Sequence, residues 1–136
     1  MFIATANYMQ NIPAPLHDRL EIIELSSYTD FEKTEIAKSH LIERVLKESG
    51  LKKTQFKISD KVLHFIIRRY TMEAGVRMLY RTLDKVARKI VVEQLKGKTS
   101  TAAITEDRIR ELLGVERFDY SKKDSEAQVG ATQGLA

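Results

Sequence analysis

The sequence predicts a mainly α-helical domain of about four helices with two short β-strands, preceded by the edge of a larger α/β domain. Three observations predict this fold class. Apolar residues recur at three- and four-residue steps over long stretches, which is the period of an α-helix. Serine or threonine stands just before several of these stretches, where its side chain can cap a helix. Short apolar or alternating runs lie between the helical stretches and at the start of the chain, as expected for strands.

Residues 1–25 have the pattern of a strand edge. Residues 1–6 form an apolar run that stops at Asn7, and residues 21–25 form a second strand-like segment. Residues 11–15 contain two prolines and predict a loop rather than a helix, because proline lacks a backbone donor and restricts the residue before it. A lone strand needs a sheet, so we expect residues 1–25 to belong to a larger α/β domain.

Thr29 marks the start of the first predicted helix. Glu32 follows three residues later and completes a capping box, and Gly50 ends the helix just after Glu48. The residues expected on the apolar stripe are Ile36, His40, Leu41, Val45 and Leu46. The residues expected to face water are Glu32, Lys33, Lys38, Glu43 and Lys47.

Three further helices follow. Ser59 caps the second, and Thr105 caps the last, which runs to Leu113. The third begins near Gly75 and has the strongest periodicity, so we expect it to form the centre of the core. Its apolar positions are Val76, Leu79, Leu83, Val86, Ala87, Ile90, Val91 and Leu95. Residues 55–58 and 101–104 predict two short strands that could pair.

Composition narrows the functional classes. The 136 residues, 43% of them hydrophobic, suffice for one modest core. A net charge of +4 favours acidic partners such as nucleotides or nucleic acid. The absence of cysteine excludes a disulfide framework and a thiolate metal site, and the three histidines lack metal-binding spacing. The initial apolar run is too short to cross a bilayer, so we expect a soluble, cytoplasmic protein.

Arg77 is the residue that physical reasoning singles out. Gly75 is expected to break the preceding helix, and Arg77 follows in the first turn of the next predicted helix. A cation in that turn opposes the helix dipole at a cost of a few tenths to about 1 kcal/mol. A nearby anion would remove that cost. The other interpretation is a solvated arginine that pairs with Glu73.

Two residues of the N-terminal segment are further candidates. Asn7 ends a predicted strand, and ligands of open α/β sheets bind beyond the carboxyl ends of strands, although asparagine is also a common turn residue. Arg19 lies in a charged segment after the proline loop. A surface ion pair with Asp18 or Glu21 would also explain it.

Several motifs, in order and spacing, resemble one family. They are Phe-Ile-Ala-Thr-Ala-Asn at 2–7, the segment 12–23, Tyr28-Thr29 with Glu32-Lys33, Gly-Leu-Lys-Lys at 50–53, Ile-Ile-Arg-Arg-Tyr-Thr at 66–71, Glu-Ala-Gly-Val-Arg at 73–77, and the segment 113–120. Together they closely resemble the ATPase module of bacterial Lon proteases, which are AAA+ ATP-dependent serine proteases. The resemblance covers essentially the whole chain.

The resemblance implies three regions. Residues 1–25 would be the C-terminal remnant of the large α/β subdomain, residues 26–117 the small helical lid subdomain, and residues 118–136 a linker toward a protease domain. Asn7 matches sensor 1, which positions the attacking water. Arg19 matches the arginine finger, which reaches ATP in the neighbouring subunit. Arg77, supported by Gly75 and Val76, matches sensor 2, which contacts ATP in its own subunit.

The resemblance also implies the setting in which these residues act. The longer protein would be a cytoplasmic homohexameric ring that uses ATP with Mg²⁺ to unfold and translocate protein substrates for degradation, without a membrane. The chain has no phosphate-binding Gly-x-x-x-x-Gly-Lys-Ser/Thr loop and no serine-lysine peptidase pair. We therefore expect the isolated chain to be non-catalytic and to hold no cofactor. Met72 and Tyr80 depart from the family pattern of arginine and an acidic residue, which we expect to alter surface contacts.

A nucleic-acid-binding module is the second hypothesis. Residues 75–98 carry seven lysines or arginines against two acidic residues, and some bacterial Lon proteins bind DNA. The candidate phosphate contacts are Arg81, Lys85, Arg88 and Lys89. No aromatic ladder accompanies this charge, and a solvated helix face is the other interpretation.

Overall fold

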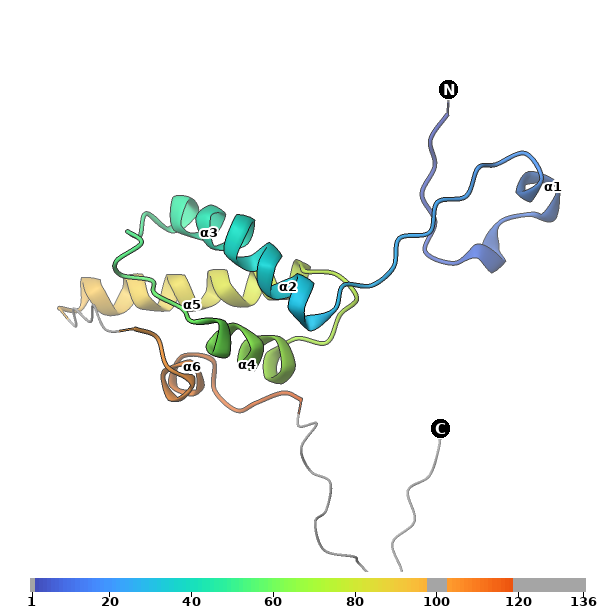
Figure 1. Ribbon diagram of the computed structural model, residues 1–136. Helices are drawn as coiled ribbons and strands as arrows, with labels where there is room; N and C mark the ends of the chain where they lie inside the picture. Colours follow the sequence, from blue (N-terminus) through green and yellow to red (C-terminus); the bar gives the residue numbers. More distant parts are fainter. Residues whose placement is uncertain (1, 98–102, 119–136) are drawn as a thin grey trace, which may run out of the picture.

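The computed structural model describes residues 2–97 and 103–118, and in this part of the chain the secondary structure is helical. The elements are a 3-10 turn η1 (Met9–Asn11), a single turn α1 (Ala14–His17), α2 (Asp30–Ile36), a π-helical segment η2 (Ala37–Leu41), α3 (Ile42–Ser49), α4 (Asp60–Tyr70), α5 (Arg77–Leu95) and α6 (Glu106–Leu113). Figure 1 shows α2, η2 and α3 as one continuous rod lying along α5, with α4 and α6 on the other side. The mainly helical class is confirmed.

Side-chain caps begin three of the packed helices where the sequence predicts them. The Thr29 hydroxyl accepts a hydrogen bond from the Glu32 amide at 3.2 Å, and the Glu32 carboxylate accepts one from the Thr29 amide at 2.8 Å. This capping box lowers the pKa of Glu32, because its hydrogen bonds with Thr29 favour the carboxylate. The Ser59 hydroxyl accepts a hydrogen bond from the Val62 amide and caps α4, and the Thr105 hydroxyl accepts one from the Arg108 amide and caps α6. The predicted helix starts are therefore correct at these sites.

The first long helix does not bury the same side chains that the sequence predicts. Lys33 is buried and His40 is exposed, whereas the sequence predicts the reverse. The π-helical segment Ala37–Leu41 has a wider turn than an α-helix and shifts the apolar stripe around the rod, so Ala37 is buried and His40 is not. Lys33 is buried because its ammonium group has a backbone partner in another part of the chain.

Helix α5 supplies the centre of the core, as predicted. Its buried face packs against α3, α4 and α6. Each fully buried leucine or isoleucine side chain of this kind contributes roughly 1.5–3 kcal/mol to folding. The buried hydrophobic residues are Ala37, Val45, Leu46, Leu51, Phe56, Val62, Leu63, Ile66, Ile67, Tyr70, Leu79, Leu83, Val86, Ala87, Ile90, Ile104, Ile109 and Leu112.

The two short strands predicted at 55–58 and 101–104 do not form in the described residues. Ile58 and Ile104 instead make one isolated parallel bridge, and the Ile104 amide donates to the Lys57 carbonyl at 2.9 Å. Thr101 and Ala102, half of the second predicted strand, lie outside the described residues. The predicted contact between the two segments is thus present, but as a single bridge.

The N-terminal segment, residues 2–27, extends away from the helical body (Figure 1). Neither predicted strand forms within residues 2–25, because a strand needs a partner for its backbone groups and the described chain offers none. The expectation that residues 11–15 exclude helix is wrong in part. Pro13 occupies the N-cap position of the turn α1, and Pro15 lies within its first turn, where a missing amide donor does no harm.

One further prediction falls on residues that the structure does not describe. Most of the linker predicted at 118–136 lies in residues 119–136, beyond the described part of the chain. Among the described residues, no helix has the length and apolar character that crossing a membrane requires.

Gly50 and Gly75 provide a matched pair of stability variants. Gly50 ends α3 with φ of +70°, in the left-handed region, whereas Gly75 lies outside that region and a Cβ there would meet no atom within 4 Å. We expect Gly50→Ala to lower the free energy of unfolding by about 1 kcal/mol and Gly75→Ala to leave it unchanged or slightly raised. Urea unfolding of the chain measures both, and equal losses would contradict this account.

Candidate functional site

The loop between α4 and α5, residues 71–76, carries the candidate site. Helix α4 ends at Tyr70, and Thr71 adopts an extended conformation with φ of −128°. The buried Thr71 hydroxyl donates to the Ile67 carbonyl at 2.7 Å and closes the helix end. Gly75 therefore does not break the preceding helix, contrary to the sequence-based interpretation. It lies in the bend that leads into α5, and its Cα faces open space.

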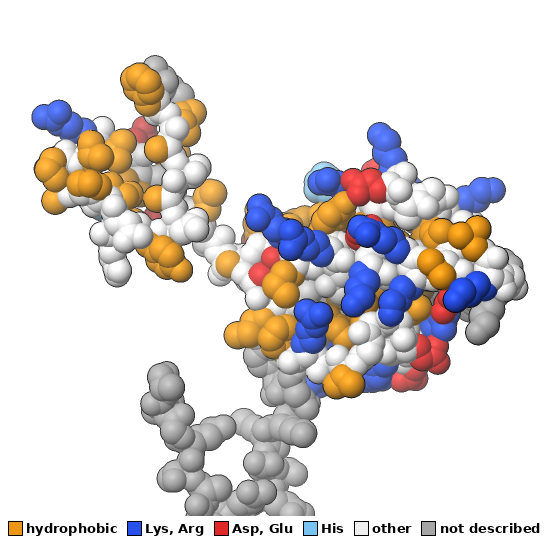
Figure 2. Space-filling model, turned by 180° about the vertical axis from the view of Figure 1, so that it is seen from behind, with side chains coloured by type: hydrophobic (Ala, Val, Ile, Leu, Met, Phe, Trp, Pro, Cys, Tyr) orange, Lys and Arg blue, Asp and Glu red, His pale blue; other side chains and the backbone are white. Residues whose placement is uncertain are grey.

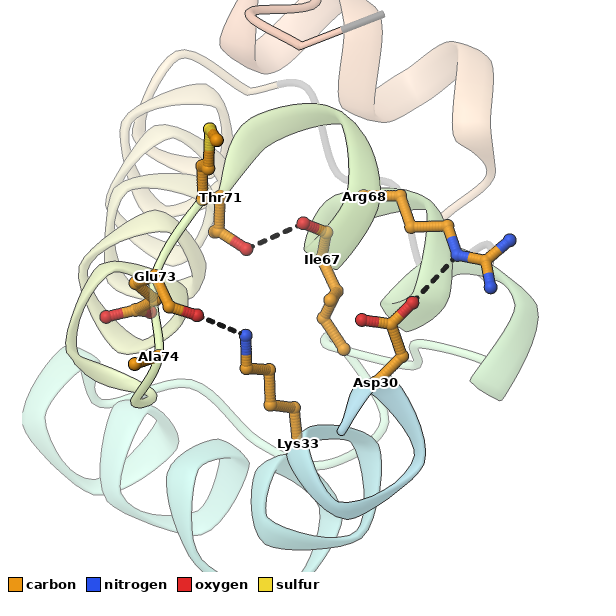
Figure 3. A pocket seen from close by; sticks show the side chains of 8 residues that line it. Asp30, Lys33, Ile67, Arg68, Thr71, Glu73 and Ala74 are labelled. Carbon is orange, nitrogen blue, oxygen red and sulfur yellow. Dashed lines mark hydrogen bonds and ion pairs between the residues drawn. The ribbon is translucent and has the colours of Figure 1, made fainter. Parts of the chain in front are cut away.

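Three hydrogen bonds hold this loop in place. The Tyr28 amide donates to the Ala74 carbonyl at 3.0 Å, and the Lys33 ammonium group donates to the Glu73 carbonyl. The Leu79 amide donates to the Glu73 carboxylate at 2.8 Å. Figure 3 shows the Lys33 side chain reaching across from α2 to the backbone of Glu73. The loop is thus fixed both to the entry of α2 and to the first turn of α5.

Glu73 acts as the cap of α5. Val76, at the N-cap position, has an apolar side chain and makes no side-chain capping bond. The Glu73 carboxylate takes over this role, because it accepts from one of the amides that have no partner within the helix and puts negative charge at the positive end of the helix dipole. The ion pair between Glu73 and Arg77 that the sequence allowed is not formed.

Arg77 is the first residue of α5, and its side chain is exposed. Its guanidinium group makes no hydrogen bond and no ion pair with any described residue. Arg81 and Lys85 follow at four-residue steps on the same helix, are also exposed, and likewise lack a described partner. Like charges at this spacing repel one another. The start of α5 therefore presents positive charge that the described chain does not neutralise.

A small hollow lies beside this row of charges. It has a volume of about 220 Å³ and is lined by Tyr70, Met78, Arg81, Thr82, Lys85, Leu113 and Arg117. Figure 2 shows lysine and arginine side chains gathered over one face of the helical body. The preference for acidic partners that the composition suggests stays a prediction.

The other two candidate contacts to nucleic acid on α5, Arg88 and Lys89, have partners within the chain. Arg88 pairs with Asp84 one turn earlier, and the Lys89 ammonium group donates to the Leu112 carbonyl at the end of α6. Of the four residues proposed to contact nucleic acid, only Arg81 and Lys85 are therefore without a described partner.

Asn7 and Arg19 lie in the N-terminal segment, and both are exposed. The Arg19 amide donates to the Leu16 carbonyl at 3.0 Å, but its side chain pairs with neither Asp18 nor Glu21. No hydrogen bond or ion pair among the described residues joins residues 2–27 to the helical body. The structure does not bring Asn7 or Arg19 together with Arg77, and their roles stay predictions.

Sequence reasoning assigned no special role to a second, larger pocket. It has a volume of about 570 Å³ and is lined by Asp30, Lys33, Ile67, Arg68, Thr71, Met72, Glu73 and Ala74. Two of these lining residues, Arg68 and Asp30, form an ion pair at 2.8 Å (Figure 3). Met72, one of the two departures from the family pattern, is an exposed residue of this pocket.

The other departure, Tyr80, belongs to a surface cluster. Its hydroxyl donates to Glu48, which raises the pKa of Tyr80, and the Arg44 guanidinium lies 4.7 Å from the centre of its ring. The cluster joins α3 to α5. Within the described residues, no three histidine, aspartate or glutamate side chains are grouped so that they could hold a metal ion.

Comparison with known proteins bears directly on the loop and the helices around it. Residues 47–103 match the family model described as the Lon protease AAA+ ATPase lid domain. Over the whole chain, the sequence is 56% identical to the Lon protease of Mycoplasmopsis agalactiae, 55% to that of Mycoplasma mobile and 46% to that of Rhizobium meliloti. The chain belongs to the Lon protease family.

The match to the Lon lid model runs from the end of α3 through α4 and α5. It therefore includes residues 73–77 and the hydrogen bond between Glu73 and the Leu79 amide. The chain spans 14%, 16% and 17% of the length of these three Lon relatives. The boundaries at residues 25 and 117 stay predictions.

Glu73 and Arg77 should differ sharply in what they contribute to stability. We expect Glu73→Leu to lower the free energy of unfolding by about 1 kcal/mol, as the loss of a helix cap does, and Glu73→Gln to cost less because it keeps an acceptor oxygen. Arg77→Ala should change stability by less than about 0.5 kcal/mol, since Arg77 is exposed and has no hydrogen bond or ion pair with a described residue. Urea unfolding tests this, and an Arg77→Ala loss as large as that of Glu73→Leu would refute it.

Proposed function

We propose that this chain forms the lid of the ATPase module of an ATP-dependent Lon-type serine protease, with Arg77 as the nucleotide sensor. One observation carries the proposal. The guanidinium group of Arg77 is exposed and without a described partner at the start of a helix whose opposite face is buried. An arginine held in this way is available to a ligand and contributes little to holding the lid together.

The chemistry around Arg77 suits a phosphate group. The first amides of a helix and the positive end of its dipole favour anions, and guanidinium groups bind phosphate oxygens through two parallel hydrogen bonds. Gly75 precedes it in a conformation that alanine could also adopt, with open space at its Cα. A glycine that the fold itself does not require permits close approach of a ligand to the backbone. Both features support ATP as the ligand.

The packing of α5 suggests how binding at Arg77 would move the lid. Leu79, Leu83 and Val86 have no exposed surface, so α5 and the helices around it behave as one packed body. A pull on Arg77 by the nucleotide would then turn the lid as a unit. We propose that this rotation couples ATP hydrolysis to the unfolding and translocation of protein substrates for degradation.

The N-terminal segment fits the proposed large α/β subdomain. Its apolar side chains are widely exposed, and Phe2, Ile23 and Leu25 have relative exposures of 103%, 77% and 92%. Figure 2 shows hydrophobic side chains gathered over the N-terminal segment. Such exposure is typical of a surface that another part of a protein covers. In that setting Asn7 would orient the attacking water. Arg19 would reach ATP in the next subunit of a homohexameric ring, where it stabilises transition-state charge.

The other functional parts of the proposed protease would lie elsewhere in a longer cytoplasmic protein. ATP is the substrate, and Mg²⁺ would enter with it, so we assign no residue of this chain to the metal. No Gly-x-x-x-x-Gly-Lys-Ser/Thr pattern occurs in this sequence, and we assign the phosphate-binding loop and the serine-lysine pair to other parts of that longer protein. Nucleic-acid binding is the weaker proposal, because Arg88 and Lys89 already have partners within the chain.

The role of Arg77 can be tested in the full-length protease. We expect Arg77→Ala to slow ATP-dependent protein degradation by about tenfold or more, because a charge-assisted contact to phosphate is lost, and to leave ATP-independent cleavage of short peptides nearly unchanged. Degradation of a folded substrate and hydrolysis of a short peptide are measured side by side. Arg81→Ala, an exposed arginine one turn later, is the matched control.

Two results would count against the proposal. One is an equal loss of both activities in Arg77→Ala, which would indicate damage to the whole enzyme. The other is an equal effect of Arg81→Ala on degradation, which would indicate a diffuse charge effect in place of a specific contact.

A further inference from the structure

The buried lysine of α2 is the starting point. Lys33 is only 7% exposed, yet none of the described carboxylates pairs with it, and its described hydrogen-bond partner is the backbone carbonyl of Glu73. Removing an ammonium group from water is costly, so an apolar side chain of similar length would fill this position at lower cost. The contact with Glu73 therefore requires an explanation beyond packing.

A continuous path of contacts leads from Lys33 to the start of α5. The Lys33 ammonium group fixes the backbone of Glu73, and the Glu73 carboxylate accepts the Leu79 amide at 2.8 Å. Leu79 has no exposed surface and lies two residues after Arg77. Figure 3 shows the first part of this path, with Lys33 pointing from α2 into the loop.

We propose that Lys33 is a positioning residue for Arg77, acting through Glu73. The inference rests on the proposed function, since it gives Lys33 a role in nucleotide sensing. Residues 72–76 have no regular secondary structure and depend on side contacts for their shape. With Lys33 in place, Glu73 caps α5 and the first turn holds Arg77 in one direction. Without it, the cap loosens and Arg77 samples several directions.

The residues that anchor the loop lie together at the start of α2, which strengthens the inference. Lys33 and Tyr28 lie on either side of the Thr29 capping box, which fixes the first turn of α2. Arg68 ties the end of α4 to Asp30 in that same turn. The first turn of α2 is thus the frame against which the loop before Arg77 is set. A lysine that only filled space would not need a bond to the loop.

The first experiment tests the path in the 136-residue chain by amide hydrogen exchange. The variant is Lys33→Met, which keeps the length of the side chain and removes its donors. The matched control is Lys38→Met, an exposed lysine of the same rod that pairs with Glu35 and Asp60. The Leu79 amide reports on the cap, and the Leu63 amide, which donates to Ser59 at the start of α4, reports on overall stability.

In Lys33→Met we expect the exchange rate of the Leu79 amide to increase about tenfold more than that of the Leu63 amide. The reason is that the start of α5 would open locally while the rest of the fold stays closed. Lys38→Met should change neither amide selectively. Equal acceleration of Leu79 and Leu63 in Lys33→Met would show that Lys33 only stabilises the fold as a whole, and would overturn the inference.

The second experiment tests the coupling in the full-length ATPase. Lys33→Met is made in the wild-type background and in Arg77→Ala, and KM for ATP and kcat are measured for each. If Lys33 acts through Arg77, Lys33→Met raises KM several-fold, up to about tenfold, in the wild-type background and adds nothing in Arg77→Ala. A merely structural role predicts the same factor in both backgrounds.

The outcomes separate this inference from the function on which it rests. If Arg77→Ala alone leaves KM and kcat unchanged, the proposed nucleotide sensor is wrong and the role of Lys33 falls with it. If Arg77→Ala impairs the enzyme and Lys33→Met has the same effect in both backgrounds, only the positioning role of Lys33 is overturned.

Discussion

One face of α5 is buried along most of its length, and the geometry of the candidate site depends on this burial. Leu79, Leu83 and Val86 are completely enclosed by α3, α4 and α6. Because side-chain positions along a helix repeat with a fixed period, burying these residues fixes the face of α5 on which Arg77 lies. The helix cannot rotate to redirect Arg77 without exposing its own apolar face.

At the start of α5, one charged side chain stabilises the fold and another is available to bind a ligand. Glu73 supplies the negative charge and the acceptor that the helix start requires, and Lys33 and Tyr28 hold Glu73 and Ala74 in place. Arg77 is left outside this arrangement. No described residue neutralises this cation, which lies at the positive end of a helix dipole, and this is the physical basis for assigning it to a phosphate.

Much of the fold could be predicted from residue types alone. Thr29, Ser59 and Thr105 cap helices through local hydrogen bonds, and the apolar period of α5 is long enough to exclude a strand. These signals are local, so a single sequence carries them. The position of Arg77 in the first turn of α5 is local in the same sense, because it depends only on where the helix begins.

Other features depend on contacts between distant residues. Lys33 reaches a carbonyl 40 residues away, which no pattern within α2 reveals, and the π-helical segment that exposes His40 has no clear mark in the sequence. Glu73 stands four residues before Arg77, a spacing that suggests an ion pair within a helix, but α4 ends at Tyr70 and leaves Glu73 free to cap α5. The predicted strands at the N-terminus need a sheet that the described residues do not contain.

The central claim is that Arg77 contacts a phosphate of ATP, and nucleotide affinity tests it most directly. The dissociation constant of a non-hydrolysable ATP analogue would be measured for the full-length wild-type protein, for Arg77→Ala and for Arg81→Ala. A lost charge-assisted hydrogen bond is worth about 1.5–3 kcal/mol, so Arg77→Ala should bind the analogue roughly 10- to 100-fold more weakly while Arg81→Ala binds as the wild type does. Unchanged affinity in Arg77→Ala would contradict the account.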